Sequence, residues 1–161
     1  MSLDVTNLAA WLRTRTDAAA VLAAPLTLFE PKSFPGDGLI GAAWLGGLRV
    51  IPRRSTLAST CAGLTWNVRL YRNALGSKAD ADAIDPAMLT AAVAIINQWH
   101  SDLEITDSGG NVIGNFDPLG GESAGAPLSS DSGYIDIDKR LIRVLTITCN
   151  VIVDGAWAQV R

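Results

Sequence analysis

Apolar residues recur at helical spacing near the N-terminus of the chain. They are Leu8, Trp11 and Leu12. Positions three and four apart share one side of a helix, so this spacing predicts a helix with one apolar face. Asp4 or Thr6 can cap it, because their side-chain oxygens accept hydrogen bonds from the free amides of the first turn. Thr16 and Asp17 suggest a second helical start over 18–24, which Pro25 ends.

The most regular helical pattern begins at Asp85-Pro86. Aspartate is a good N-cap, and proline is pre-organised for the first helical position. The apolar stripe that follows comprises Leu89, Ala92, Val93, Ile96, Trp99 and Leu103. A stripe of this length must pack on another layer, and a sheet is the natural partner.

Alternating patterns predict the strands. Residues 65–73 alternate apolar and polar side chains, which is typical of a strand with one buried face. Residues 134–153 predict a β-hairpin with its turn at Asp138-Lys139, and the second arm is rich in β-branched residues. Residues 39–51 are apolar but contain glycines, which favours a strand with a bulge.

Residues 107–133 are rich in Gly, Ser and Asp and predict a long loop, in which only Val112, Ile113 and Phe116 hint at a strand. Helices and strands are therefore partly segregated along the chain. This order favours a single α+β domain spanning residues 1–161, a two-layer domain with a mostly antiparallel sheet, one long helix packed on it and an N-terminal helix.

Composition narrows the function. The chain of 161 residues is 48% hydrophobic and only 18% charged, so polar surface is scarce and some apolar surface is expected to face neighbouring subunits. A net charge of −3 disfavours a nucleic-acid-binding module. The start of the chain lacks a signal-peptide pattern, and no apolar run approaches the ~20 residues of a membrane helix. Cys61 and Cys149, far apart in apolar stretches, are expected to be buried thiols.

Catalytic chemistry finds little support. The single histidine, His100, follows Trp99 at a helix end, with no family signature around it or Cys61. Asp136 and Asp138 share a strand face but lack the further oxygen ligands that a cation requires. The glycines form no phosphate-binding motif. We therefore expect a non-enzymatic protein without metal or cofactor. A small enzyme with an unrecognised site is the weaker alternative.

Charged residues fall into two groups that we expect to contact partners. The basic group is Arg49, Arg53, Arg54, Arg69 and Arg72, in which Arg49 and Arg69 could sit side by side on neighbouring strands. The acidic group is Asp107, Asp117, Glu122 and Asp131, all in the predicted loop. Opposite charges on two subunits set register and specificity; a solvated strand edge is the alternative for the arginines. Trp44, Trp66 and Trp157 are further contact candidates, although core packing is the simpler reading of each.

Several segments resemble a known family. They are residues 70–73, residues 85–89, the stretch YIDIDKRLIRVLTIT at 134–148, and VIVDGAW at 151–157. These look like tail terminator proteins of long-tailed actinobacteriophages. The resemblance covers most of residues 65–161 and the general layout of the N-terminal part. It does not place residues 31–48. The matching motifs are structural rather than catalytic.

The resemblance implies a small α/β protein that assembles in the host cytoplasm into a homohexameric ring. Such a ring caps the head-proximal end of the virion tail tube, stops the tube protein from polymerising and offers a surface to the neck. DNA passes through the lumen without specific binding, and an acidic loop there would keep phosphates from sticking. Another phage neck component, a head-closure or head-tail connector protein, is the alternative.

Overall fold

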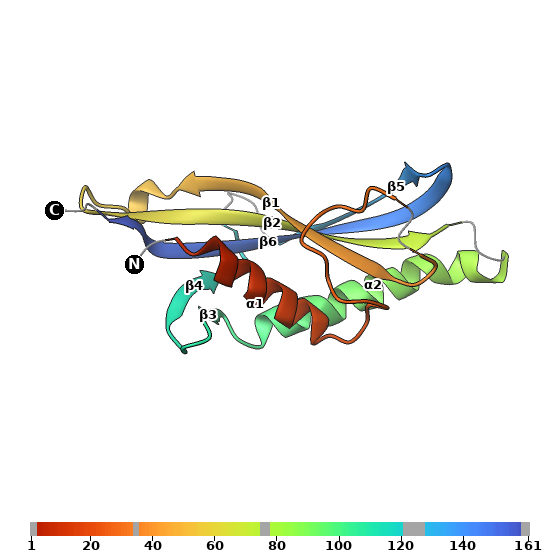
Figure 1. The fold of residues 1–161 in the computed structure, drawn as a ribbon, viewed down its shortest axis with the longest axis horizontal. Coiled ribbons are helices and arrows are strands. Elements are labelled where there is room, and N and C mark those ends of the chain that lie inside the picture. The colour runs from red at the N-terminus through yellow and green to blue at the C-terminus, as the bar shows by residue number, and fades with distance from the viewer. Residues whose placement is uncertain (1–2, 34–35, 75–77, 121–127, 159–161) are drawn as a thin grey trace.

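A computed structural model describes residues 3–33, 36–74, 78–120 and 128–158. These residues form two α-helices, a short 3-10 helix and one six-stranded sheet (Figure 1). In chain order the elements are α1 (Val5–Asp17), β1 (Ile40–Val50), η1 (Pro52–Arg54), β2 (Ser59–Asn73), α2 (Lys78–His100), β3 (Glu104–Thr106), β4 (Val112–Phe116), β5 (Ser130–Ile137) and β6 (Arg140–Ala158).

The sheet is built around two long antiparallel strands, β2 and β6. Their pairing runs from Ser59 opposite Ala158 to Asn73 opposite Ile142, with one irregularity near Thr60. The strand order is β1-β2-β6-β4-β3, and β5 also pairs with β6, next to the part of β6 that precedes the β4 contact. Every strand pair is antiparallel.

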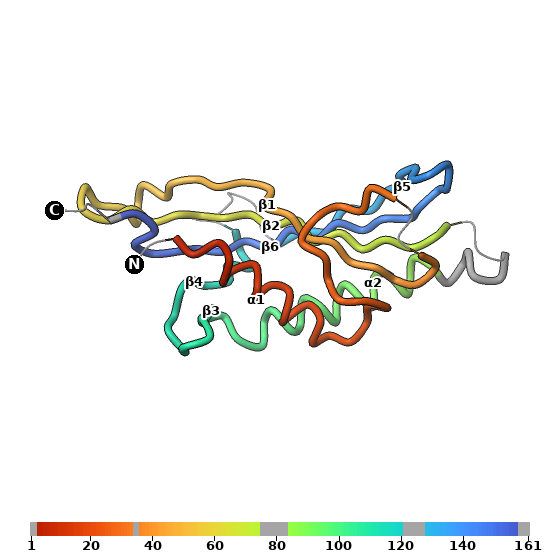
Figure 2. The backbone as a smooth tube through the Cα atoms, in the orientation of Figure 1, coloured from red at the N-terminus to blue at the C-terminus, as the bar shows by residue number. Residues whose placement is uncertain are grey.

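Both helices lie on one side of the sheet (Figures 1 and 2), which we call the front face. The main core fills the space between, and its sheet side comes from alternate residues of the long strands, such as Leu64, Val68 and Ile147. On the other side, the back face, a smaller cluster joins Ala42, Tyr71, Ile142 and Val144. The predicted α+β two-layer domain is confirmed.

The start of α1 matches the prediction and its end does not. The Asn7 amide donates to Asp4 Oδ1 at 3.0 Å, so Asp4 is the N-cap. The second helical start predicted after Asp17 is wrong, because Ala18 caps the helix and Ala20 takes a positive φ of 53°. The following segment then runs beside β1 (Figure 2). Thr27 in this segment forms a parallel bridge with Ala42 of β1.

The start of α2 also differs. The helix begins at Lys78 and contains Pro86 in its interior, so the predicted start at Asp85 is wrong. Proline has no amide hydrogen to give to the preceding turn, but a helix can continue through it at the loss of one hydrogen bond. Asp85 does not cap a helix here; its carboxylate reaches across to β6.

The strand predictions hold, with additions. A register shift between Leu45 and Gly47 supplies the predicted bulge of β1, and Asp138 and Lys139 form the predicted turn, both at positive φ. The long loop predicted over 107–133 is interrupted by β4 and ends where β5 begins at Ser130. The strand hinted at by Val112, Ile113 and Phe116 is confirmed as β4, which has five residues and pairs with β6 through Asn115 and Phe116.

Candidate functional site

The five arginines singled out in the sequence do not form one cluster. Arg49 lies opposite Gly63 of β2, whereas Arg69 lies opposite Ala42 of β1. The two therefore sit six residues apart along β2, from Gly63 to Arg69, or roughly 20 Å. The expectation that Arg49 and Arg69 lie side by side is wrong, because antiparallel pairing places β1 residues 42 and 49 at different levels of β2.

Arg69 has an internal role. Its guanidinium donates to Glu30 Oε1 at 2.7 Å and to Thr146 Oγ1 at 2.8 Å, and it stacks over the Trp44 ring with 4.9 Å to the centroid. Glu30 belongs to the segment that crosses the back face. Arg69 therefore ties this segment to β2 and β6.

The other arginines lie at the two ends of the molecule. Arg49, Arg53 and Arg54 gather near the end of β1, where Arg54 pairs with Asp154 at 3.0 Å. Arg72 lies at the opposite end of β2, across from Arg143. The sheet therefore concentrates three of the five positive charges beside the exposed end of β1.

The acidic residues are separated as well. Asp107 accepts hydrogen bonds from the amides of Gly109 and Asn111 and from the Asn111 side chain, and these bonds lower the pKa of its carboxyl. Asp117 accepts the Gly120 amide at 3.0 Å and so closes a turn after β4. Asp131 lies exposed on β5, opposite Thr146. Glu122 lies outside the described residues. The three described acids, Asp107, Asp117 and Asp131, do not lie in one loop, so the placement of an acidic loop in a ring lumen stays an expectation from the sequence.

The tryptophans divide between core and surface. Trp66 is buried in the main core, and Trp44 is half-buried under Arg69. Trp157 lies opposite Thr60 near the end of β6 and is 43% exposed, which keeps it available for a partner.

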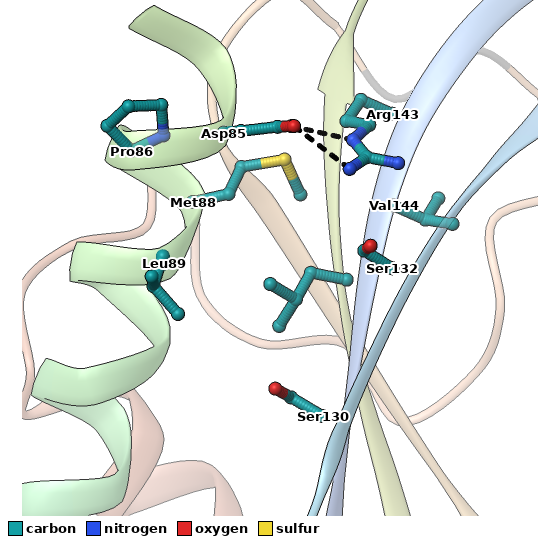
Figure 3. A pocket seen from close by; sticks show the side chains of 9 residues that line it. Asp85, Pro86, Met88, Leu89, Ser130, Ser132, Arg143 and Val144 are labelled. Atoms are coloured by element: carbon teal, nitrogen blue, oxygen red, sulfur yellow. Dashed lines mark hydrogen bonds and ion pairs between the residues drawn. The ribbon is translucent and has the colours of Figure 1, made fainter.

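A pocket of about 480 Å³ opens between α2 and the β5–β6 hairpin (Figure 3). Two ionisable side chains, Asp85 and Arg143, point toward one another in it, with Arg143 Nε 2.7 Å from Asp85 Oδ1 and a second contact of 3.0 Å. The guanidinium's hydrogen bonds lower the pKa of Asp85, and the carboxylate in turn raises that of Arg143. Because the two charges neutralise each other, we interpret the pair as a structural contact that links α2 to the sheet.

The remaining reactive groups are held in packing roles. His100 packs edge-on against Phe116, with ring centroids 5.3 Å apart. Cys61 and Cys149 are buried free thiols, as predicted, and burial raises the pKa of Cys149. Within the described part of the chain, no three His, Cys, Asp or Glu side chains gather as a metal site would require.

Sequence reasoning did not identify the edge strands of the sheet, which among the described residues are β1, β5 and the three-residue β3. β1 pairs with β2 on one side, and on its other side only the bridge at Ala42 covers it among the described residues. β5 pairs with β6 and has no other strand partner in the described ranges. Beyond the bridge, β1 exposes the apolar side chains of Leu45, Leu48 and Val50, at 41, 47 and 49%. Their alternation with Arg49 was the available signal.

The comparisons with known proteins leave the family open. No protein-family model matches the chain, and no curated protein matches it. No helix within the described ranges combines the length and apolar character that a membrane span requires.

Proposed function

We propose that the chain is a non-enzymatic structural subunit that assembles into a ring at the head-proximal end of a phage tail tube. In this role it ends tube polymerisation and joins the tail to the neck of the virion. Its partners are further copies of itself, the tube protein and a neck protein, and genomic DNA passes through the ring without specific binding.

The observation that supports the proposal most is the place of the resembling segments in the fold. The stretch 134–157, which resembles tail terminators, forms most of the β5–β6 hairpin, and β6 is the strand to which β2, β4 and β5 all pair. The resemblance therefore concerns the structural centre of the domain. The edges of β1 and β5 and the apolar end of β1 add surfaces that suit a subunit built to bind neighbours.

The test uses the purified protein with tubes polymerised from the tail tube protein of the phage that encodes it. Light scattering gives the mass of the protein with and without tubes. Electron microscopy of gold-labelled protein shows where it binds and how long the tubes grow. We expect label at one tube end only and tubes that shorten as protein is added.

Two other outcomes decide against the proposal. Protein that binds isolated heads but ignores tube ends supports the alternative, a head-closure or head-tail connector protein. Protein that stays monomeric and binds neither tubes nor heads overturns both readings.

A further inference from the structure

Three strands of the described sheet lie at an edge, β1, β5 and the three-residue β3, and the edges of the two longer ones, β1 and β5, differ in position and charge. The edge of β1 beyond Ala42 ends near Arg49, Arg53 and Arg54; Asp154 offsets the charge of Arg54, and the end is basic through the other two. The turn after β5 has mixed charges, with Asp136 and Asp138 beside Lys139 and Arg140, whereas the start of β5 carries Asp131 and is acidic. Two identical edges repel each other because their charges are alike, whereas a basic edge and an acidic edge attract. Charge therefore favours a contact between β1 of one copy and β5 of another over a contact between two identical edges.

The backbone of β1 offers hydrogen bonds outward at defined positions. The Ile51 amide donates inward to the Cys61 carbonyl at 2.9 Å. Because inward and outward groups alternate along an antiparallel edge, Arg49 also bonds inward, while Leu48 and Val50 point their amides and carbonyls outward.

The backbone of β5 has a matching pattern. The Thr148 amide donates to the Ser129 carbonyl at 3.0 Å, and Asp131 lies opposite Thr146 in the same register. The same alternation directs the backbone groups of Ser130, Ser132 and Tyr134 away from β6. Both edges therefore direct backbone groups away from their partner strand at every second residue.

Strand direction and face then fix how the edges can meet. Since each pair from β1 through β2 and β6 to β5 is antiparallel, β1 and β5 run in opposite directions within one chain. If a second copy extends the sheet with its front face continuous, its β1 must run antiparallel to β5. Leu48 and Val50 of that copy then share the front face with Ser130 and Ser132, and Arg49 shares the back face with Asp131.

We infer that the sheet continues from copy to copy, with β1 of one subunit adding to β5 of the next in antiparallel register, Arg49 facing Asp131. The register of β1 on β5 can shift only by an even number of residues, because an odd shift would exchange the front and back faces. Among the even shifts, the attraction between Arg49 and Asp131 favours the one that places them opposite each other. Leu48 then lies opposite Ser132, and Leu45, across the bulge, lies on the same face as Tyr134. This contact would join neighbouring subunits in the ring of the proposed function. The contact itself is argued from the strands, and only its closure into a ring rests on the proposed function.

This contact joins two different surfaces, so it propagates and closes a ring only if the rotation between copies allows it. Asp131 lies opposite Thr146 of β6, whereas Arg49 lies, through Gly63, level with Ile152. Each copy is therefore shifted by six residues, from Thr146 to Ile152, or roughly 20 Å along the strands. Closure then requires strands tilted against the ring axis, as in a barrel.

Cysteine cross-linking tests the register directly. In the inferred pair, Leu48 and Ser132 form a hydrogen-bonded pair with Cα atoms about 5.5 Å apart, within the range of a disulfide. We expect the L48C/S132C variant to form a ladder of linked oligomers on oxidation. Mixing the two single variants should give linked dimers and nothing larger, because each copy then has one reactive edge.

Charge reversal tests the pairing without new bonds. Arg49→Asp and Asp131→Arg should each weaken self-association at least about tenfold, and the double variant should recover most of the loss. Arg13→Asp, which reverses an exposed charge on α1, is the control and should change little. Circular dichroism confirms that each variant stays folded.

The outcomes separate this contact from the proposed function. No ladder from L48C/S132C, or efficient linking of Leu48→Cys to itself, overturns the contact. The contact is also overturned if the double charge-reversal variant loses as much self-association as the two single variants combined. Tube capping by a protein that fails these tests leaves the function standing with another contact. A cross-linked ladder without tube capping leaves the contact standing and refutes the function.

Discussion

The Asp85–Arg143 pair joins the outer part of α2 to the hairpin. Two parallel hydrogen bonds, at 2.7 and 3.0 Å, give it the bidentate geometry that guanidinium and carboxylate groups favour. The guanidinium of Arg143 also stacks over the Tyr134 ring, with 4.6 Å between its Cζ and the ring centroid, and donates a hydrogen bond to the Gly133 carbonyl. These two contacts with β5 fix the orientation of the Arg143 side chain, so Asp85 pairs with a guanidinium that is already held in place.

This pair should make stability depend on acid. Because hydrogen bonding lowers the pKa of Asp85 below its ordinary value of 3.8, its contribution is present above that pH. It is lost as the pH falls through the lower folded pKa. We expect Asp85→Asn to reduce the free energy of unfolding near pH 7 and to have a shrinking effect below about pH 4. Urea unfolding from pH 2 to 7 measures this; an effect independent of pH contradicts it.

Cys149 should be chemically inert in the native protein. Its side chain is fully buried, and burial raises the pKa of the thiol. The reactive species is the thiolate. We expect no alkylation of Cys149 by iodoacetamide at pH 8 until the chain is unfolded in urea, as read by mass spectrometry. The V93C variant, at an exposed position of α2 away from the inferred contact, is the positive control, and rapid native labelling of Cys149 would contradict the burial.

At the scale of elements, the β5–β6 turn carries backbone strain. Asp138 and Lys139 have φ values of 52° and 59°, a region that costs a non-glycine residue about 1–2 kcal/mol. Two positive φ values suit a two-residue hairpin, and glycine is preferred there.

Replacing Lys139 with glycine should therefore stabilise the protein. Relief of strain outweighs the extra chain entropy of glycine, and we expect a gain of about 0.5–1 kcal/mol in the free energy of unfolding. Arg140→Gly, one residue later at the start of β6, should instead destabilise by a similar amount. Equal effects of the two changes in thermal unfolding would exclude strain at the turn.

The packing of α2 on the sheet gives a second contrast. Ile95 is fully buried beneath the helix, whereas Val93 is 49% exposed. We expect Ile95→Ala to cost about 2–5 kcal/mol through lost burial and the cavity left behind. Val93→Ala should stay within about 1 kcal/mol. Denaturant unfolding compares them, and similar losses would mean that the two sides of α2 are not distinguished as described.

Elements with a strong local pattern could be predicted from sequence. The alternation in β2, the β-branched residues of β6 and the capping role of Asp4 each act within a few residues. The start of α2 could not be predicted, because Asp85 and Pro86 look like a helix start and only the long-range contact with Arg143 gives Asp85 another use. β4 gave only a hint in the sequence, because it is short and depends on a partner strand that lies far along the chain.

The candidate contacts depended even more on tertiary structure. Arg49 and Arg69 are both on strands, but their separation follows from the register of β1 on β2, which the sequence does not state. The burial of Trp66 and the stacking of Arg69 on Trp44 likewise come from pairing. Edges were missed because a strand becomes an edge only when the order of the whole sheet is known.

At the scale of the whole molecule, self-association should respond to salt. The inferred contact pairs a basic edge with an acidic one, and exposed charges are screened beyond about 10 Å at 0.1 M salt. We expect association to weaken as salt rises from 0.05 to 0.5 M. In the R49L/D131L variant, this dependence should be smaller. Sedimentation measures both, and identical salt dependence would mean that these side chains do not meet.

The bare edges of β1 and β5 also carry a risk for the free chain. Any strand with unpaired backbone groups is a template for unrelated strands, including those of misfolded proteins. The glycines at the bulge of β1 and the charges of Arg49 and Asp131 are the kind of feature that keeps such edges from aggregating. The same two charges thus oppose aggregation while the subunit is free. Aggregation of newly made protein should be lowest where other copies are abundant enough to cover both edges.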